Sequence, residues 1–364
     1  GTCDLAGRRS RSLLTGRGGG RPWSMADAPL PFDPGDGRWL AHRYVEGQDR
    51  LRFRWFPRER HRAITFLSDE EVGAGPQHEM QRSEFLALAA AEKRPAPALI
   101  FHSAFCCSTL LLRSLDLPGT ASGFSEPMIL NDVAGLALRR GDPRQVAAAM
   151  DAALHALARP LAGGERTVVK PSNVVNALAP LVLALRPDAR LLLLHARLDA
   201  FVASIARKEI EGRLWVRELF WKLLQLGLVA RFGLGEEELL RLTDLQVAAL
   251  SWLAQHALFA ELASRHPVNV RTLESGRLMT CPAEALAALG QHFGLRIDAA
   301  AIAAGPAFTA HSKDGRPFDA AARAEEEARG VKLHAREIEV VLHWAGKMAD
   351  HAGISLKLPA PLIP

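Results

Sequence analysis

Short apolar segments that alternate with helical segments constrain the fold of this chain more than any other feature. The strand-like segments are 98–101, 166–170, 190–195 and 268–273. Helical patterns follow the first three of them, and strands that alternate with helices favour a parallel sheet with helices on both faces. We therefore expect residues from about Pro97 onward to form one three-layer α/β domain.

A small antiparallel element is expected ahead of this domain. Segments 40–45, 51–56 and 63–67 alternate as strands do, and Gly47-Gln48-Asp49 suits a turn. Residues 79–93 then favour a helix that the prolines at 95 and 97 end. The predicted organisation is a leader over 1–25, the antiparallel element with its helix over 26–95, and the α/β domain over 96–364.

Helical patterns in the second half of the chain predict an insertion in the α/β domain. They cover residues 214–231 and 236–266, so we place the helical insertion at about 209–266. Another helix is expected over 282–293, after the last strand-like segment.

The net charge of +5 does not indicate a nucleic-acid partner. Five arginines against one aspartate within residues 1–25 account for four of these charges, so the remainder of the chain is almost neutral. A nucleic-acid-binding domain should carry a basic face. Residues 1–25, rich in Arg, Gly and Ser, are expected to be a disordered basic leader or an added extension, with a transit peptide as the alternative.

Hydropathy and cysteine spacing indicate a cytoplasmic protein that neither crosses a membrane nor binds a metal. No uncharged run reaches the roughly 18 to 20 residues that a membrane-spanning helix needs. The four cysteines form no C-x-x-C pair and no metal-like spacing with histidine. A reducing compartment is the simplest setting for them.

Residues 100–113 combine an apolar strand, a turn of small residues and a helix that starts at Ser108 and Thr109. Backbone N–H groups at a helix start lack partners and carry partial positive charge, so such a turn can hold a phosphate, to which hydroxyl groups also donate. The turn lacks the Gly-Lys pair of a Walker A loop, because no Lys precedes Ser108. Magnesium-dependent ATP chemistry is therefore disfavoured.

This turn resembles the 5'-phosphosulfate loop of sulfotransferases, with residues 104–109 on its six positions. Further segments follow in family order over roughly residues 97 to 320. They are Glu126-Pro127, the strand 168–170 with the turn 171–173, the strand and helix 191–204, the acidic segment 270–278, and His311-Ser-Lys-Asp-Gly315 in place of the nucleotide-binding "RKG" loop.

The resemblance implies a P-loop NTPase-like sulfotransferase fold. It also implies an enzyme that transfers a sulfuryl group from 3'-phosphoadenosine 5'-phosphosulfate to a hydroxyl or amine of a small molecule or carbohydrate, without a metal. Glu126 would be the base and Lys170 would stabilise developing charge. The donor-binding residues implied by the resemblance are Ser103, Cys107, Ser108, Thr109, Arg197, Ser204, Lys313 and Gly315.

Three positions depart from the family pattern. Phe105 replaces the loop Arg or Lys, Cys107 replaces its Gly, and Ala196 replaces the Arg that holds the 3'-phosphate, although Arg197 is adjacent. Other cations would have to substitute, and the candidates are Arg113, Lys170, Arg197 and Lys313. Two alternatives therefore stay open: a non-catalytic binding or assembly subunit with this fold, and a group-transfer enzyme that uses another nucleotide donor. A homodimer is also left open.

Several of these residues also have a purely structural interpretation. Glu126 would cap the next helix and Lys170 would reach solvent from a strand end. His102 and His195 would be hydrogen-bonded core histidines, and Cys106-Cys107 would be small packing residues rather than reactive thiols. Trp215 and Trp221 would belong to the core or to an interface.

Overall fold

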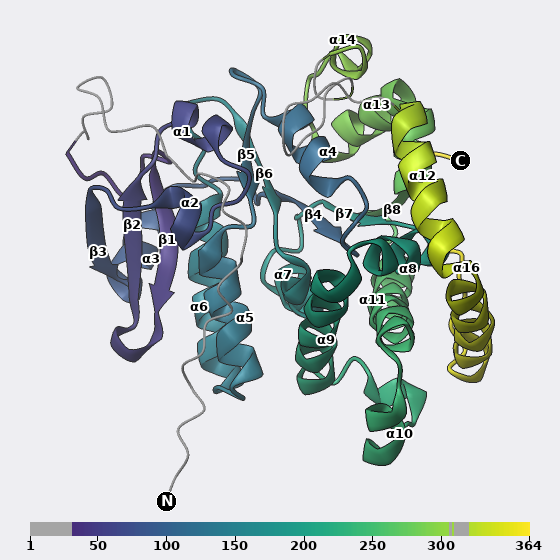
Figure 1. Ribbon diagram of the computed structural model, residues 1–364. Helices are drawn as coiled ribbons and strands as arrows, with labels where there is room; N and C mark the ends of the chain where they lie inside the picture. The colour runs from purple at the N-terminus through teal and green to yellow at the C-terminus, as the bar shows by residue number, and fades with distance from the viewer. Residues whose placement is uncertain (1–30, 306–307, 309–319) are drawn as a thin grey trace, which may run out of the picture.

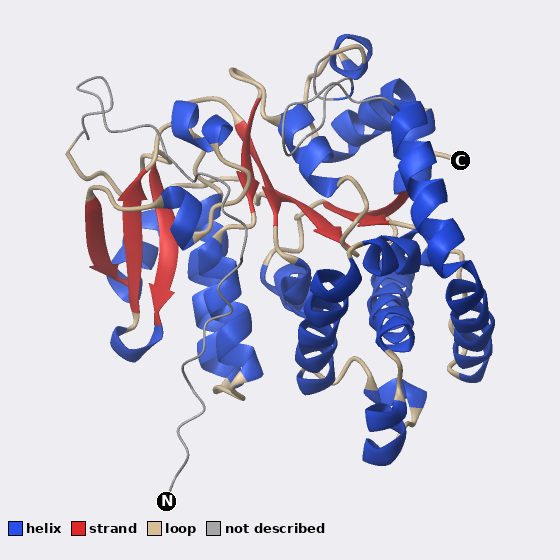
Figure 2. Cartoon of the chain, in the orientation of Figure 1, coloured by secondary structure: helices blue, strands red, loops and turns tan. Residues whose placement is uncertain are grey.

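The computed structural model describes residues 31–305, 308 and 320–364, which form one parallel and one antiparallel sheet together with their helices (Figure 2). Five parallel strands lie in the order β5-β6-β4-β7-β8. They are β4 (Ala98–His102), β5 (Ala121–Ser125), β6 (Arg166–Lys170), β7 (Leu191–His195) and β8 (Val270–Glu274). The predicted α/β class with a parallel sheet is confirmed.

The strand order places a crevice at the end of β4. This strand comes first along the chain but lies in the middle of the sheet, with β6 on one side and β7 on the other. The chain builds β5 and β6 to one side of β4, and then β7 and β8 to the other side. In open parallel sheets, ligands bind outside the carboxyl ends of the strands where the winding reverses. That position is the carboxyl end of β4, where the turn of small residues begins.

Alternate side chains of the strands feed two separate hydrophobic clusters, because successive residues of a strand point to opposite faces. Ile100, Leu192 and Leu194 belong to one cluster. Leu99 and Leu193 belong to the other. Both faces of the sheet are therefore buried, which explains the continuous apolar strands that the sequence shows.

Helices cover both faces of this sheet (Figure 1). One face packs against α4 (Ser108–Leu115), α12 (Ser275–Thr280) and α13 (Pro282–Phe293). The other face packs against α6 (Pro143–Leu157), α7 (Ala179–Leu185) and α11 (Asp244–Arg265). The remaining long helices are α5 (Met128–Leu138), α8 (Leu198–Arg207), α9 (Glu209–Gln225) and α16 (Ala320–His351).

The predicted helical insertion contains α9, α11 and the short α10 (Glu236–Arg241). Thr243 starts α11 with a capping box, since its hydroxyl accepts from the Gln246 N–H while the Gln246 side chain accepts from the Thr243 N–H. The short α14 (Ala299–Ala303) follows α13. Within the described residues, no helix is both long and apolar enough to cross a membrane.

The antiparallel element is present, but its third strand was predicted in the wrong place. The sheet consists of β1 (Trp39–Val45), β2 (Arg50–Trp55) and β3 (Gln77–Gln81), with β2 in the centre, and α3 (Arg82–Ala90) follows it. Segment 63–67 instead follows α1 (Arg58–Ala63) as a loop.

Side-chain hydrogen bonds explain why segment 63–67 does not become a strand. The Glu71 carboxylate on α2 (Asp69–Val72) accepts from the N–H groups of Thr65 and Phe66 at 2.6 and 3.2 Å. The Leu67 N–H donates to the Ser125 carbonyl oxygen at 2.8 Å. The backbone donors of this segment are thus satisfied without a neighbouring strand.

The antiparallel element shares its hydrophobic core with the α/β layers. Trp39 and Phe53 belong to the same buried cluster as Met150 and Leu154 of α6. Arg43 of β1 also forms a two-pronged ion pair with Asp132 of α5, with N–O distances of 2.7 and 2.8 Å.

The C-terminal segment covers the free edge of β8. The Thr272 N–H donates to the Ala360 carbonyl oxygen at 3.0 Å, and the Leu362 N–H donates to the Thr272 carbonyl oxygen at 2.8 Å. Backbone groups at this edge of the sheet are thus paired within the chain, which protects them from pairing with another protein.

Candidate functional site

The turn after β4 holds its backbone in an uncommon conformation. Ala104, Phe105 and Cys107 have φ angles of 69°, 51° and 62°. A residue other than glycine in this left-handed region costs free energy, and such residues gather at binding and catalytic sites. The surrounding structure must therefore hold the turn in place.

His102 is the residue that fixes the turn. Its Nδ1 accepts a hydrogen bond from the Ala104 N–H at 3.1 Å, and its Nε2–H donates to the Pro171 carbonyl oxygen at 3.0 Å. The Asn176 side chain donates to the His102 carbonyl oxygen at 2.9 Å. Burial, reinforced by the nearby Lys170 ammonium, lowers the pKa of His102 well below its usual value. The neutral ring can thus accept at one nitrogen and donate at the other.

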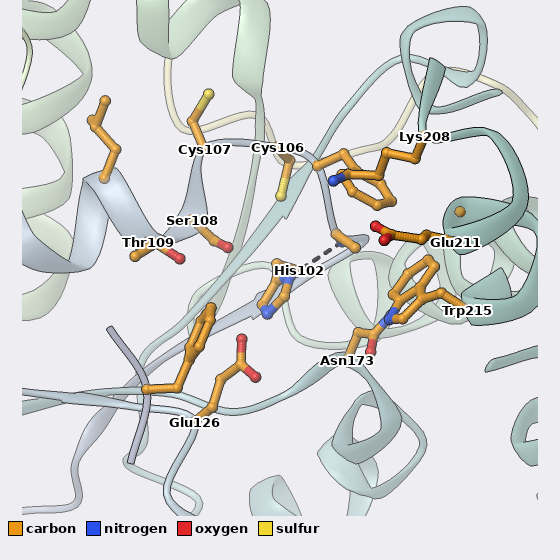
Figure 3. A pocket seen from close by; sticks show the side chains of 15 residues that line it. His102, Cys106, Cys107, Ser108, Thr109, Glu126, Asn173, Lys208, Glu211 and Trp215 are labelled. Carbon is orange, nitrogen blue, oxygen red and sulfur yellow. Dashed lines mark hydrogen bonds between the residues drawn. The ribbon is translucent and has the colours of Figure 1, made fainter. Parts of the chain in front are cut away.

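A cavity of about 450 Å³ opens over this turn and over the first residues of α4 (Figure 3). We call it the loop cavity. Its lining comes from the turn and α4, from the ends of β4 and β5, from the loop before α2, and from η3 (Asn173–Leu178) and α9. The lining residues are Phe66, His102, Ala104–Leu110, Glu126, Asn173, Lys208, Glu211, Gly212 and Trp215.

The start of α4 forms part of the wall of the loop cavity. Unpaired N–H groups and a positive dipole end are general properties of a helix N-terminus. Ser108 and Thr109 stand in the first turn of α4, and both line the cavity. The two predicted hydroxyl donors and Cys107 therefore lie where the sequence placed them, around one hollow.

Glu126 and Lys170 form an ion pair at the base of the loop cavity. The Lys170 Nζ lies 2.5 Å from the Glu126 Oε1 and 5.2 Å from the centre of the Phe66 ring. The Lys170 side chain is fully buried, whereas the Glu126 side chain is 26% exposed and lines the cavity. Glu126 does not cap α5, and Lys170 does not reach solvent, so both structural interpretations of these residues are wrong.

The two cysteines of the turn differ in their surroundings. Cys106 is buried, and its thiol donates to the Leu194 carbonyl oxygen at 3.5 Å. Burial raises the pKa of the Cys106 thiol to about 12. Cys106 is therefore a packing residue, as expected, while Cys107 stands at the N-cap of α4.

Ser103 lies beneath the loop cavity rather than in its lining. It is buried, and its hydroxyl oxygen accepts from the Ala196 N–H at 3.1 Å. Because Ala196 follows β7, this bond ties the carboxyl ends of β4 and β7 together.

Of the residues predicted to bind the 3'-phosphate, Arg197 and Ser204 do not line the loop cavity. Arg197 precedes α8 with 67% of its side chain exposed, and it pairs with Asp199 at 2.8 Å. This contact raises the pKa of Arg197. The Ser204 hydroxyl donates to the Ala200 carbonyl oxygen at 2.7 Å within α8. Lys313 and Gly315 lie outside the described residues.

Arg113, another cation considered from the sequence, also points away from the loop cavity. It stands in the last turn of α4 and donates to the Ile64 carbonyl oxygen at 3.1 Å. Among the residues that the structure describes, no three His, Cys, Asp or Glu side chains gather as metal ligands would.

Sequence reasoning did not assign Lys208 or Glu211 to the site, and it placed Trp215 in the core or at an interface. Lys208, the N-cap of α9, and Glu211 and Trp215 of α9 line the loop cavity beside the turn (Figure 3). The Trp215 ring lies 5.2 Å from the Phe105 ring at 72°, and the Lys208 Nζ lies 5.9 Å from the Phe105 ring centre. No local motif marks these residues, because only the packing of α9 beside the turn brings them there.

Comparisons with known proteins found a similar solved structure but no match in sequence. No family model matches the sequence, and no curated protein matches it either. A solved sulfotransferase domain from the curacin biosynthetic pathway is similar over 74% of this chain and 100% of its own length. The TM-score is 0.38 and the sequence identity is 14%, which is too low to assign a fold family or an activity.

Proposed function

We propose that the loop cavity binds the phosphosulfate end of 3'-phosphoadenosine 5'-phosphosulfate and that the protein transfers its sulfuryl group to a hydroxyl or amine. The observation that carries this proposal is the pair of Lys170 and Glu126, joined at 2.5 Å at the base of a cavity that also contains the start of α4. The site combines a buried cation, a carboxylate and the N–H groups of a helix start. Such groups can stabilise the charge that develops while a group is transferred from one oxygen to another.

The proposed reaction is an in-line displacement at sulfur. The acceptor oxygen or nitrogen forms a bond to sulfur while the bond from sulfur to the bridging phosphate oxygen breaks, and adenosine 3',5'-bisphosphate leaves. The Glu126 carboxylate takes the acceptor proton, for which its exposure to the cavity suits it. The N–H groups of α4 stabilise charge on the leaving phosphate, and the buried Lys170 ammonium adds its positive field from behind Glu126 without touching the phosphate.

Lys208 is the cation that would compensate for Phe105. Its ammonium lies near the Phe105 ring at the wall of the loop cavity. A lysine on α9 can approach a bound anion from the side opposite the turn. The loop cation that the family carries would thus be supplied by a different element.

A second candidate function is nucleotide binding without catalysis. Phe105 packs edge-on against Trp215, and Lys170 already has a carboxylate partner at 2.5 Å. A third is transfer from a nucleotide without a 3'-phosphate, which the pairing of Arg197 with Asp199 favours.

Thermal shift with three nucleotides separates these functions. Adenosine 3',5'-bisphosphate, AMP and ATP are each added to the purified protein. A ligand at about 100 times its dissociation constant adds roughly 2.7 kcal/mol of stability. Selective stabilisation by the bisphosphate is expected, and Ser108→Ala with Thr109→Val should weaken it. Thr280→Val, an exposed hydroxyl of α12, is the matched control and should leave it unchanged.

The outcome then decides between the three candidates. Bisphosphate binding together with sulfuryl transfer from the full donor supports the leading proposal. Binding without transfer to any acceptor in a broad screen favours the binding subunit. Equal or stronger stabilisation by AMP or ATP favours another donor, and no shift with any nucleotide overturns the leading proposal.

A further inference from the structure

A second, larger cavity shares no lining residue with the loop cavity and includes His195, the last residue of β7. It has a volume of about 1330 Å³ and is enclosed by α11, by the end of β8 and by the C-terminal segment 353–364. We call it the tail cavity. None of the residues assigned above to the donor or to catalysis lines it.

The walls of the tail cavity are mostly apolar. They come from three separate parts of the chain: one side of α11, the end of β8 and the C-terminal segment. The apolar lining residues are Ala257, Ala260, Leu273, Ile354, Leu356, Leu358, Pro359, Pro361 and Ile363. Such a surface suits the hydrocarbon part of a ligand.

The lining of the tail cavity contains more positively charged than negatively charged side chains. Four cations line it, Arg231, Arg265, Arg277 and Lys357, against the two carboxylates of Glu261 and Glu274.

Existing ion pairs use only part of this positive charge. Glu261 is shared, since its oxygens lie 3.9 Å from Arg231 and 3.6 Å from Arg265. Arg277 donates to the Pro364 carbonyl oxygen at 2.7 Å. Within the described part of the chain, no Asp or Glu side chain forms an ion pair with Arg277 or Lys357, and Pro364 is the contact that a bound anion would replace at Arg277. The cavity therefore favours an anion.

His195 gives the cavity a polar inner wall. Only 9% of this residue is exposed, and its buried Nδ1 has no hydrogen-bond partner among the described residues. A buried polar atom without a partner destabilises the fold, so a ligand that supplies one is favoured. Because His195 pairs in register with Glu274, and Arg277 follows on α12, His195 and Arg277 lie at the same end of the sheet.

A second buried histidine, His256, lies next to His195. The ring of His256 lies 5.5 Å from the ring of His195 and stacks on Trp252 at 4.1 Å. Both ring nitrogens of His256 are buried without a partner among the residues described. His256 does not line the cavity, so the neutral His195 imidazole is the ring whose N–H donor can serve an oxygen-rich head group at this end.

We propose that the tail cavity binds an amphipathic monocarboxylate, such as a medium-chain fatty acid. The carboxylate lies at the end that holds His195 and Arg277, and the hydrocarbon chain lies along α11 and the C-terminal segment. This assignment does not depend on the proposed sulfuryl transfer, because the two cavities share no lining residue.

Isothermal titration of the full chain with dodecanoate tests this proposal. Dodecanoate should bind, and dodecanol, which has the same chain without the charge, should bind at least about tenfold more weakly. Arg277→Gln and His195→Phe should each weaken dodecanoate binding by about tenfold. Lys222→Gln, an exposed cation on α9, is the matched control and should leave the affinity unchanged.

Two further measurements distinguish a variant that has lost the binding site from one that no longer folds correctly. His195→Phe removes an unsatisfied polar atom, so its melting temperature should not fall while dodecanoate affinity does. Ala260→Trp should place an indole ring in the apolar part of the cavity and weaken dodecanoate binding by about tenfold with unchanged circular dichroism. Absence of dodecanoate binding to the wild-type protein, or equal binding by wild type and Ala260→Trp, would overturn the proposal.

Discussion

The two regions predicted to hold the two phosphates of the donor differ in how much structure exists before a ligand binds. At the carboxyl ends of β4 and β6, buried His102 and Lys170 already have fixed partners beside the loop cavity. At the carboxyl end of β7, Arg197 is 67% exposed and pairs with Asp199. Any 3'-phosphate there would have to replace Asp199, whereas a 5'-phosphate would meet a prepared turn.

We conclude from this difference that burial prepares a site more than the presence of a cation does. A long exposed side chain loses conformational entropy when it binds, and solvent screens its charge. A buried group has already lost that entropy during folding. We therefore expect variants near β4 to change both folding and binding, and variants near β7 to change binding alone.

Glu126→Gln should have the largest effect, a loss of about 3–5 kcal/mol in the free energy of unfolding. The substitution leaves the fully buried Lys170 ammonium without its carboxylate. Lys170→Met should cost less, because the Glu126 side chain that remains is partly exposed. Urea denaturation of both variants measures the difference. Equal losses, or a Glu126→Gln loss below about 1 kcal/mol, would contradict this assignment of burial.

His102→Leu should follow, with a loss of about 1–3 kcal/mol for each polar group left buried and unpaired. The Ala104 N–H and the Pro171 carbonyl oxygen both lose their partner. Release of the turn should also weaken the binding of every nucleotide tested. His351→Leu, at the exposed end of α16, serves as the control and should change neither quantity. If the His102→Leu variant bound nucleotides as well as the wild type does, His102 would not be needed to hold the binding site.

The pH dependence of stability tests the protonation state of His102. Its pKa is lower in the folded chain than in the unfolded chain, so the unfolded chain binds more protons in acid. Stability should therefore be complete above the usual histidine pKa of about 6.5 and should fall as the pH drops below it. Other buried histidines with a lowered pKa, such as His195 and His256, add to the same slope. His102→Asn should flatten this slope by about one proton in unfolding experiments at several pH values.

Phe105→Lys should strengthen nucleotide binding by about tenfold, since a charge-assisted contact to phosphate contributes about 1.5–3 kcal/mol and the lost ring contact with Trp215 offsets part of it. Phe105→Leu is the control, because it removes the ring without adding charge. Calorimetric titration with adenosine 3',5'-bisphosphate and with AMP measures both. Weaker binding in the lysine variant than in the leucine variant would argue against a phosphate beside this position.

Arg197→Gln should have the smallest effect on stability, within about 0.5 kcal/mol, because the Arg197–Asp199 pair is exposed. It should lower affinity for adenosine 3',5'-bisphosphate by about tenfold and leave affinity for AMP unchanged. The ratio of the two affinities is therefore the useful measurement. An unchanged ratio would place the 3'-phosphate elsewhere.

The predicted bounds of several strands and helices agree closely with the structure. The segment 166–170 is β6, the segment 282–293 is α13, and the strand at 98–101 is one residue short of β4. In contrast, β5 was missed because its sequence Ala-Ser-Gly-Phe-Ser has no apolar run. This strand exists because β6 pairs with it along its whole length, which no local pattern reveals.

The alternation of buried strands with helices, and the turn that leads into α4, could be predicted from the sequence because they depend on neighbouring residues. The side chains that meet at this turn could not be predicted, because they come from elements far apart in the chain. Lys208 and Trp215 reach the loop cavity across a distance of about a hundred residues along the chain, and Arg197 turns to Asp199 instead. Local pattern controls backbone conformation, whereas the partners of a polar side chain depend on how distant elements pack.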